Sequence, residues 1–372
     1  MTDNQFFGNL QDHFDKSLPF VAYRKPNLNE VNAFLQSDNR VYKTINFQEK
    51  GFIFSPFNNL DDTILIPLEK SEKINLLFNF SNIEKLSDLV KNEDSLQKQQ
   101  HIILIKQGIE AIKQKAFKKV VLSRKEIIDI ENRNTIDVFK NLLKTYKSAF
   151  VYCWYHPRIG LWLGATPETL IKIEGKRFSI MALAGTQEFK GSLDVTWRQK
   201  EVHEQKVVTD FIVENLKPLV ENSNISETVT VKAGNLLHLK TIVTAKLKRN
   251  STLTDLISAL HPTPAVCGYP KNKAKQFILE NENYNREFYT GFLGELNLEN
   301  NRSPRASKRN IENRAYTVIK KSTQLYVNLR CMQIKDKQAL IYIGGGITET
   351  SNPEKEWEET VSKSLVIKSV LN

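Results

Sequence analysis

The sequence has few cysteines and no long hydrophobic run, and these absences exclude several classes of protein. Its 372 residues include only Cys153, Cys267 and Cys331, which stand far apart without a CxxC spacing. This pattern is evidence against a zinc site and a disulfide framework, so we expect three small buried residues. No apolar run approaches the roughly 18 residues needed to span a bilayer, and no signal-like segment stands near the start. We therefore expect a soluble, cytoplasmic protein that does not use a membrane.

The composition is that of a basic globular protein. Hydrophobic residues make up 40% of the chain, and the formal net charge is +11. The length allows two or three domains and a large buried core. A basic balance suits an anionic partner, either a nucleic acid or an acidic small molecule. The lysines are spread along the whole chain without a basic tail or a nucleic-acid-binding signature, so we expect no nucleic-acid partner.

Local patterns divide the chain near residue 95. Residues 1–95 hold an amphipathic segment at 6–14 and short strand-like runs, with no catalytic pattern. Isoleucines at helical spacing predict a long helix over residues 93–118. The next segment, KVVLSRKEIIDI, alternates as a strand that starts at Lys119. Residues 150–186 hold at least four β-rich runs that predict one antiparallel meander, and residues 301–310 predict a charged, solvated loop.

Two predicted helices carry paired acids in line with their apolar faces. A helix over residues 193–219 has an apolar stripe that, extended toward its start, reaches Glu204 and Glu201. A second helix is expected after Asn352, with Pro353 at its first position. On that helix Glu356, Glu359 and Lys363 share a face. The sequence before it, Gly344, Gly345 and Gly346, predicts a glycine-rich turn that lets backbone N–H groups approach an anion.

The acid pairs suggest a metal site, although each residue alone has an ordinary explanation. Carboxylates are the oxygen ligands that Mg²⁺ accepts, with waters and an anionic substrate completing the coordination. Lys119 and Glu168, in Thr-Pro-Glu, could serve as base and acid beside that substrate. Taken singly, Lys119 is typical of a surface lysine and Glu168 of a first-turn helix acid. By the same reasoning His238 is more often structural than catalytic.

Eight ordered blocks together resemble the chorismate-utilising enzymes. The blocks are KVVLSR, GATPETL, ALAGT, KEVHEQKVV, HPTPAVCGYP, REFYTGFLG, VNLRCMQI and GGGITETSNPEKEWEET with Lys363 behind it. Within this family the chain resembles the isochorismate synthases most closely. The resemblance covers roughly residues 100–372. It implies an α+β fold of large, mostly antiparallel sheets packed together with helices outside. It also implies a variable part over residues 1–95 and one integrated catalytic core over 96–372.

The resemblance also implies a reaction and a role for each matched residue. The reaction is a Mg²⁺-dependent isomerisation of chorismate, in which water adds at C2 and the C4 hydroxyl leaves. Lys119 would activate the water and Glu168 would protonate the departing hydroxyl. The implied metal ligands are Glu204 and Glu359, with Glu201 and Glu356 as neighbouring acids. The implied substrate-binding residues are Arg330, Lys363, Gly344, Gly345, Gly346, His238, Tyr289 and Ala265.

Two features decide the subfamily, and one residue departs from the pattern. Lys119 supplies a base where ammonia-using anthranilate synthases typically have none, and TPAVCG is unlike their corresponding block. Salicylate synthases share the lysine and are the nearest alternative, but Ala265 fits a pure synthase better. Gln205 replaces the histidine that many relatives carry after the metal glutamate. This change affects the hydrogen bonding expected to orient that glutamate as a ligand. A monomer is the simplest expectation. Whether the product serves menaquinone or siderophore biosynthesis stays open.

Overall fold

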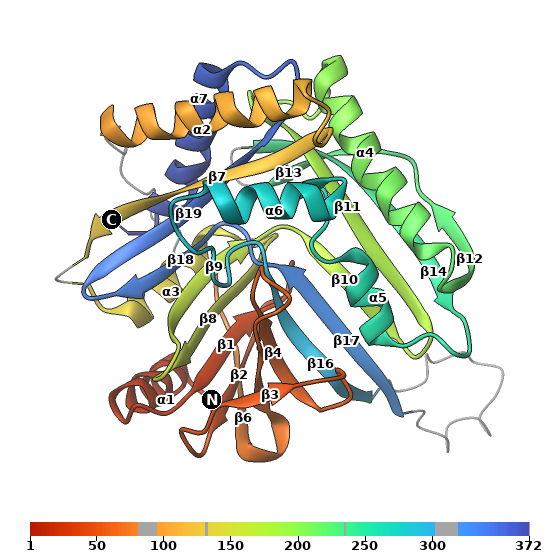
Figure 1. Cartoon of the computed structure of the whole chain (residues 1–372). Coiled ribbons are helices and arrows are strands. Elements are labelled where there is room, and N and C mark those ends of the chain that lie inside the picture. Colours follow the sequence, from red (N-terminus) through yellow and green to blue (C-terminus); the bar gives the residue numbers. More distant parts are fainter. Residues whose placement is uncertain (81–94, 131–132, 234–235, 302–318, 372) are drawn as a thin grey trace.

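The protein folds around two large antiparallel sheets, shown in Figure 1. The structure is a computed structural model, and it describes residues 1–80, 95–130, 133–233, 236–301 and 319–371. The charged loop expected at 301–310 lies almost wholly outside the described residues. In the described ranges no helix is both long and apolar enough to cross a membrane.

Sheet A combines strands from the start, middle and end of the chain. In the described part of the chain it has nine strands, and every pairing between neighbours is antiparallel. In spatial order they are β15 (Gly268–Tyr269), β7 (Lys119–Asp129), β19 (Gln338–Ile347), β18 (Cys331–Lys335), β9 (Gly160–Thr166), β8 (Phe150–His156), β1 (Phe20–Arg24), β2 (Glu30–Gln36) and β6 (Ser71–Leu77).

Sheet B is also antiparallel and lies across sheet A. Nine of its described strands follow one another, and a further strand, β13 (Val229–Ala233), pairs with β14. In spatial order the nine are β12 (Val220–Ile225), β14 (Leu236–Leu247), β11 (Arg177–Glu188), β10 (Thr169–Glu174), β17 (Ile319–Val327), β16 (Phe292–Asn301), β4 (Gly51–Ser55), β5 (Thr63–Pro67) and β3 (Tyr42–Thr44).

The helices cover the outer faces of the two sheets. In Figure 1, α4 and α5 lie over β11 and β14 of sheet B, and α2 and α7 lie together beyond β7 and β19 of sheet A. α1 and α3 pack on the same outer face of sheet A, in one apolar cluster with the end of α7. The helices are α1 (Asp3–Asp15), α2 (Ser95–Lys113), α3 (Thr135–Thr145), α4 (Gln199–Leu216), α5 (Leu253–Leu260), α6 (Lys271–Asn281) and α7 (Pro353–Lys368), with one 3-10 turn, η1 (Leu68–Lys70). This arrangement confirms the expected α+β class.

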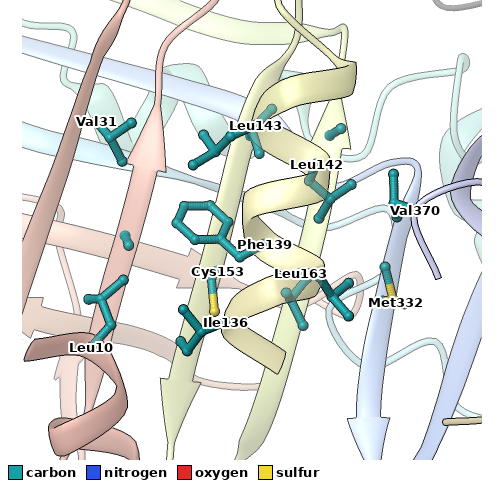
Figure 2. Packing of buried hydrophobic residues seen from close by; sticks show 14 of the residues in the cluster. Leu10, Val31, Ile136, Phe139, Leu142, Leu143, Cys153, Leu163, Met332 and Val370 are labelled. Atoms are coloured by element: carbon teal, nitrogen blue, oxygen red, sulfur yellow. The ribbon is translucent and has the colours of Figure 1, made fainter. Parts of the chain in front are cut away.

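Separate apolar layers hold these parts together. Aromatic residues from both sheets, among them Phe54, Trp162 and Tyr326, form the layer between the sheets. Figure 2 shows a second layer, in which Phe139 and Leu142 of α3 pack on Cys153 of β8 and its neighbours. Each fully buried apolar side chain stabilises the fold by about 1.5–3 kcal/mol. All three cysteines are buried and unbonded, as expected.

Residues 1–77 contribute to both sheets. Their strands β1, β2 and β6 belong to sheet A, and β3, β4 and β5 belong to sheet B. Register confirms this mixing, because β1 pairs with β8 while β4 pairs with β16. The division expected at residue 95, between a variable part and a catalytic core, stays a prediction.

Two local predictions about strands were wrong, and both errors concern residues near the candidate site. The segment 150–186 is not one meander. It forms the hairpin β8–β9 in sheet A and the hairpin β10–β11 in sheet B, and the chain crosses between the sheets at Pro167 and Glu168. The glycine triplet is not a turn either. Gly344 to Gly346 continue β19 and pair with Ser123 to Val121 of β7, because glycine tolerates the close neighbours found there.

Candidate active site

One cavity of about 120 Å³ collects most of the predicted site residues. It lies between the ends of sheets A and B and is closed by α4 and α7. The predicted residues that line it are Lys119, Glu168, Glu204, His238, Ala265, Tyr289, Arg330, Gly344, Gly346, Glu359 and Lys363. Residues separated by more than two hundred positions in the sequence therefore meet here.

Lys119 reaches the cavity from the first position of β7. Alternation along β7 points Lys119 and Val121 into the cavity, while Val120 and Leu122 pack in the apolar cluster with α2 and α6. This is the pattern that the sequence predicted. The lysine is only 4% exposed. A β-carbon at position 346 would lie 3.0 Å from its Cε and 3.4 Å from its Nζ, so Gly346 leaves the room that the ammonium group occupies.

Glu168 lies where the chain passes from sheet A to sheet B. Its backbone is held on both sides: its N–H donates to Thr166 Oγ1 at 3.3 Å, and its carbonyl accepts from Val327 N at 3.0 Å. Its side chain is 3% exposed. Burial raises the pKa of Glu168 to about 8, although the positive charge of Lys119 acts in the opposite direction. The carboxyl group is therefore mostly protonated at neutral pH and can donate a proton.

Arg330 and His238 form a cationic corner of the cavity. Arg330 donates from Nη1 to Ala233 O at 2.9 Å and from Nη2 to His238 Nε2 at 2.8 Å. His238 Nδ1 donates to Gly185 O at 2.9 Å, so Nε2 is the unprotonated nitrogen. Burial, with the charge of Arg330, lowers the pKa of His238 to about 3. His238 thus stays neutral and orients the guanidinium, whose remaining donors can meet a carboxylate.

Gly344, Gly346 and Tyr289 form another part of the cavity wall. Gly344 lies so close to Tyr289 that a β-carbon there would come within 2.8 Å of the phenol oxygen. The Tyr289 ring stacks on Tyr342 with centroids 5.5 Å apart. β18 ends opposite Tyr342, so the glycines beyond it lack a partner strand on that edge. Gly345 does not line the cavity, since its side faces Glu356.

Each acidic helix sends one carboxylate into the cavity and keeps one behind it. Glu204 of α4 and Glu359 of α7 line the cavity, while Glu201 and Glu356 do not. Lys363 lies 2.7 Å from Glu359 and also donates to Gly344 O at 2.9 Å. Burial raises the pKa of Glu204. Burial also acts to raise the pKa of Glu359, but the hydrogen bond and charge of Lys363, together with the charge of Lys200, lower it. The start of α7 is as predicted, with Asn352 capping it and Pro353 first.

The residues around these acids fit a divalent cation. Lys200 of α4 lies between the two helices, with its Nζ 2.5 Å from Glu356 Oε1 and 3.9 Å from Glu204 Oε1. A positive charge therefore already occupies the space between the carboxylates. Glu201 pairs with Arg198 at 2.6 Å, but its buried Oε2 has no hydrogen-bond partner among the described residues.

The described residues contain no group of three or more His, Cys, Asp or Glu side chains arranged to hold a metal alone. Mg²⁺ typically takes one or two carboxylates and completes its shell with water and substrate oxygens. The pair Glu204 and Glu359 suits that donor set.

Gln205 supports α4 from behind rather than contacting the neighbouring glutamate. Its Nε2 donates to Thr241 Oγ1 at 3.0 Å and to Ala182 O at 3.2 Å, which ties the helix to β14 and β11. These bonds fix the helix turn that carries Glu204. The residue therefore positions the carboxylate through the backbone.

Sequence reasoning missed three residues of the site. Lys200 stands four residues before Glu204, and that i,i+4 spacing was a usable signal. Gly185 has a φ of +75° and lies against Glu201, where a β-carbon would approach to 3.1 Å. Tyr342 could not have been identified, because its stacking on Tyr289 depends on the register of β19.

Known proteins similar to this chain share both its sequence pattern and its fold. Isochorismate synthase MenF from Pasteurella multocida is 27% identical over 81% of this chain and 70% of its own length. Isochorismate synthase EntC from Escherichia coli K12 is 30% identical over 65% of this chain. The chain spans 59% of the length of that relative. A crystal structure described as a 2,3-dihydroxybenzoate-specific isochorismate synthase from Bacillus anthracis has a TM-score of 0.75, with 21% identity, over 98% of this chain and 99% of that one.

The sequence patterns of two related families identify the chain. The pattern described as "Chorismate binding enzyme" matches residues 40–303, and a second one of the same description matches residues 316–369. The first match alone covers more than half of the chain and includes Lys119, Glu168 and Glu204, and the second includes Glu359 and Lys363. With the fold and the cavity described above, the chain belongs to the chorismate-binding enzyme family.

Proposed function

We propose that this protein is an isochorismate synthase, an isomerase of the hydroxymutase type that converts chorismate to isochorismate. The observation that carries the proposal is the pairing of Lys119 with Glu168 in one cavity. Lys119 is a buried amine, and Glu168 is a carboxyl group whose pKa is raised to about 8 by burial. Such a pair places an amine, which accepts a proton in its neutral form, beside a proton-donating carboxyl group, and these are the two groups that general acid–base catalysis needs.

The cavity also suits a substrate with two carboxylates. Arg330, oriented by His238, offers guanidinium donors to one carboxylate. Lys363 and the backbone of Gly344 add a positive charge and polar backbone groups on the same side. Tyr289 and Ala265 also line the cavity. A ring held by both ends would therefore present its middle carbons to Lys119 and Glu168.

Glu204 and Glu359 would hold Mg²⁺, with Glu201 and Glu356 behind them. When bound, the metal supplies a positive charge that neutralises the substrate carboxylate. These residues lie on two helices, α4 and α7, that close the same cavity. The acids would thus orient the carboxylate and leave proton transfer to Lys119 and Glu168.

The proposed step balances atoms and protons within the cavity. Lys119 takes a proton from a water molecule as its oxygen bonds to C2, the ring double bonds shift, and the C4–O bond breaks. Glu168 gives its proton to the departing hydroxyl, which leaves as water. One water enters and one leaves, so product and substrate are isomers. Return of the proton from Lys119 to Glu168, through solvent, restores the starting state.

Incubation of the purified protein with chorismate and MgCl₂ tests this proposal. Separation of the products by chromatography, with NMR identification, should give isochorismate. Salicylate plus pyruvate would instead support the nearest alternative, a salicylate synthase. If intact chorismate is not consumed, both readings fail. A salt-sensitive complex with generic DNA would then favour the remaining alternative, a basic nucleic-acid-binding protein. Cytoplasmic location and a monomeric state stay predictions.

A further inference from the structure

We infer that Lys200 competes with the metal ion for the same carboxylates. Its ammonium group occupies the cation position between α4 and α7 until a divalent ion displaces it. This inference rests on the proposed function for the identity of the metal. It concerns a residue that needs no contact with chorismate. Its consequence is that metal affinity is set by a side chain of this chain as well as by the ligands.

The position of Lys200 is defined by the acids of both helices. Its Nζ lies 2.5 Å from Glu356 Oε1 on α7 and 3.9 Å from Glu204 Oε1 on its own helix. Glu359 also acts on its charge. One ammonium group thus interacts with three carboxyl groups, of which we propose Glu204 and Glu359 as metal ligands and Glu356 as their neighbour.

The surroundings explain why a cation is needed there at all. Glu356 is 3% exposed, and Glu204 is 9% exposed. Buried carboxylates of like charge are costly to bring together without a compensating positive charge. Lys200 provides that charge and joins α4 to α7. The metal-free protein can therefore keep its two acidic helices in place.

Lys200 also has a route away from the acids. Its side chain is 27% exposed, whereas that of Glu356 is 3% exposed. A lysine side chain is long and flexible, so its charged end can move into water while its stem stays on the helix. A divalent ion that replaces the ammonium would leave the carboxylates compensated. Binding of the metal is then an exchange of cations, and its affinity is reduced by the bond that must be broken.

The first test is the metal affinity of Lys200→Met. Free Mn²⁺, measured by electron paramagnetic resonance during titration without substrate, gives the dissociation constant. We expect Mn²⁺ to bind about tenfold or more tightly in this variant, because no ammonium competes for the carboxylates. Lys206→Met is the matched control, since Lys206 forms an exposed i,i+4 pair with Asp210 on the same helix. Equal affinities in Lys200→Met and wild type would overturn the inference.

The second test uses the wild-type protein and does not depend on a variant that folds. Lysines are acetylated briefly with acetic anhydride, with and without MgCl₂, and the labelled peptides are quantified by mass spectrometry. Labelling of Lys200 should rise severalfold with Mg²⁺, while that of Lys206 stays constant. Unchanged or lower labelling of Lys200 contradicts displacement. Both tests omit chorismate, so they can succeed if the proposed reaction is wrong and fail if it is right.

Discussion

Two carboxyl groups face the same cavity and are held in opposite protonation states. Glu168 lies in the crossover between sheets A and B, and burial raises its pKa to about 8. Glu359 lies on α7, where burial acts to raise its pKa but Lys363, at 2.7 Å, and the charge of Lys200 lower it. One group is a proton donor at neutral pH and the other a negatively charged ligand. The difference arises from the lysines beside Glu359, and it gives the two carboxyl groups different roles in one cavity.

Of the changes to these two carboxyl groups, Glu168→Gln should reduce the turnover of chorismate most. The amide keeps the size of the side chain but cannot deliver the proton, so turnover of chorismate should fall by about 10²–10⁴-fold. Binding of Mn²⁺ and of chorismate, followed by calorimetry, should stay within a few fold of wild type. Glu188→Gln, at an exposed position at the end of β11, serves as the control. Near-normal turnover in Glu168→Gln would remove Glu168 from the mechanism.

Glu359→Gln should lose activity for a different reason, because it should weaken the binding of the metal ion. We expect turnover to drop about 10²-fold or more, with Mn²⁺ affinity falling in parallel, because a neutral amide is a poor ligand for a divalent ion. Glu358→Gln, its exposed neighbour, should match wild type. The contrast with Glu168→Gln is the informative result. If Glu359→Gln lost turnover but bound Mn²⁺ normally, the cation role would belong to other residues.

The pH dependence gives a smaller effect that concerns Glu168 alone. Its pKa is raised to about 8, so the donor is present below that pH and lost above it. Where Lys119 is already unprotonated, the value of kcat/KM should therefore fall about tenfold per pH unit above pH 8, because one required proton is lost from Glu168. Rates measured from pH 6.5 to 9.5 at saturating MgCl₂ report this limb. A rate that stays flat to pH 9.5 would mean that the protonated carboxyl is not required.

The sequence predicts those parts of the structure that depend on local spacing. Asn352 and Pro353 set the start of α7, and alternation along β7 places Lys119 in the cavity, because caps and strand periods act over a few residues. The meander around Glu168 was predicted wrongly. Local patterns show where strands occur, but which sheet a strand joins depends on pairing with distant segments, such as β10 with β17.

Of the contacts that lysines make in the site, some can be predicted from local spacing and others cannot. The i,i+4 pair of Glu359 and Lys363 can be read directly from the sequence. The bridge from Lys200 to Glu356 cannot, since 156 positions separate them and only the packing of α4 beside α7 brings them together. The raised pKa of Glu168 is likewise a property of the assembled cavity, because it depends on the exclusion of water by both sheets.

The origin of the new hydroxyl oxygen tests the central claim most directly. Turnover of chorismate by the wild-type protein in H₂¹⁸O, followed by mass spectrometry of isolated isochorismate, shows whether water is the nucleophile. The account predicts one ¹⁸O atom in each product molecule, because water activated by Lys119 adds at C2 while the C4 hydroxyl leaves. Isochorismate without the label, formed by migration of the original hydroxyl, would contradict it.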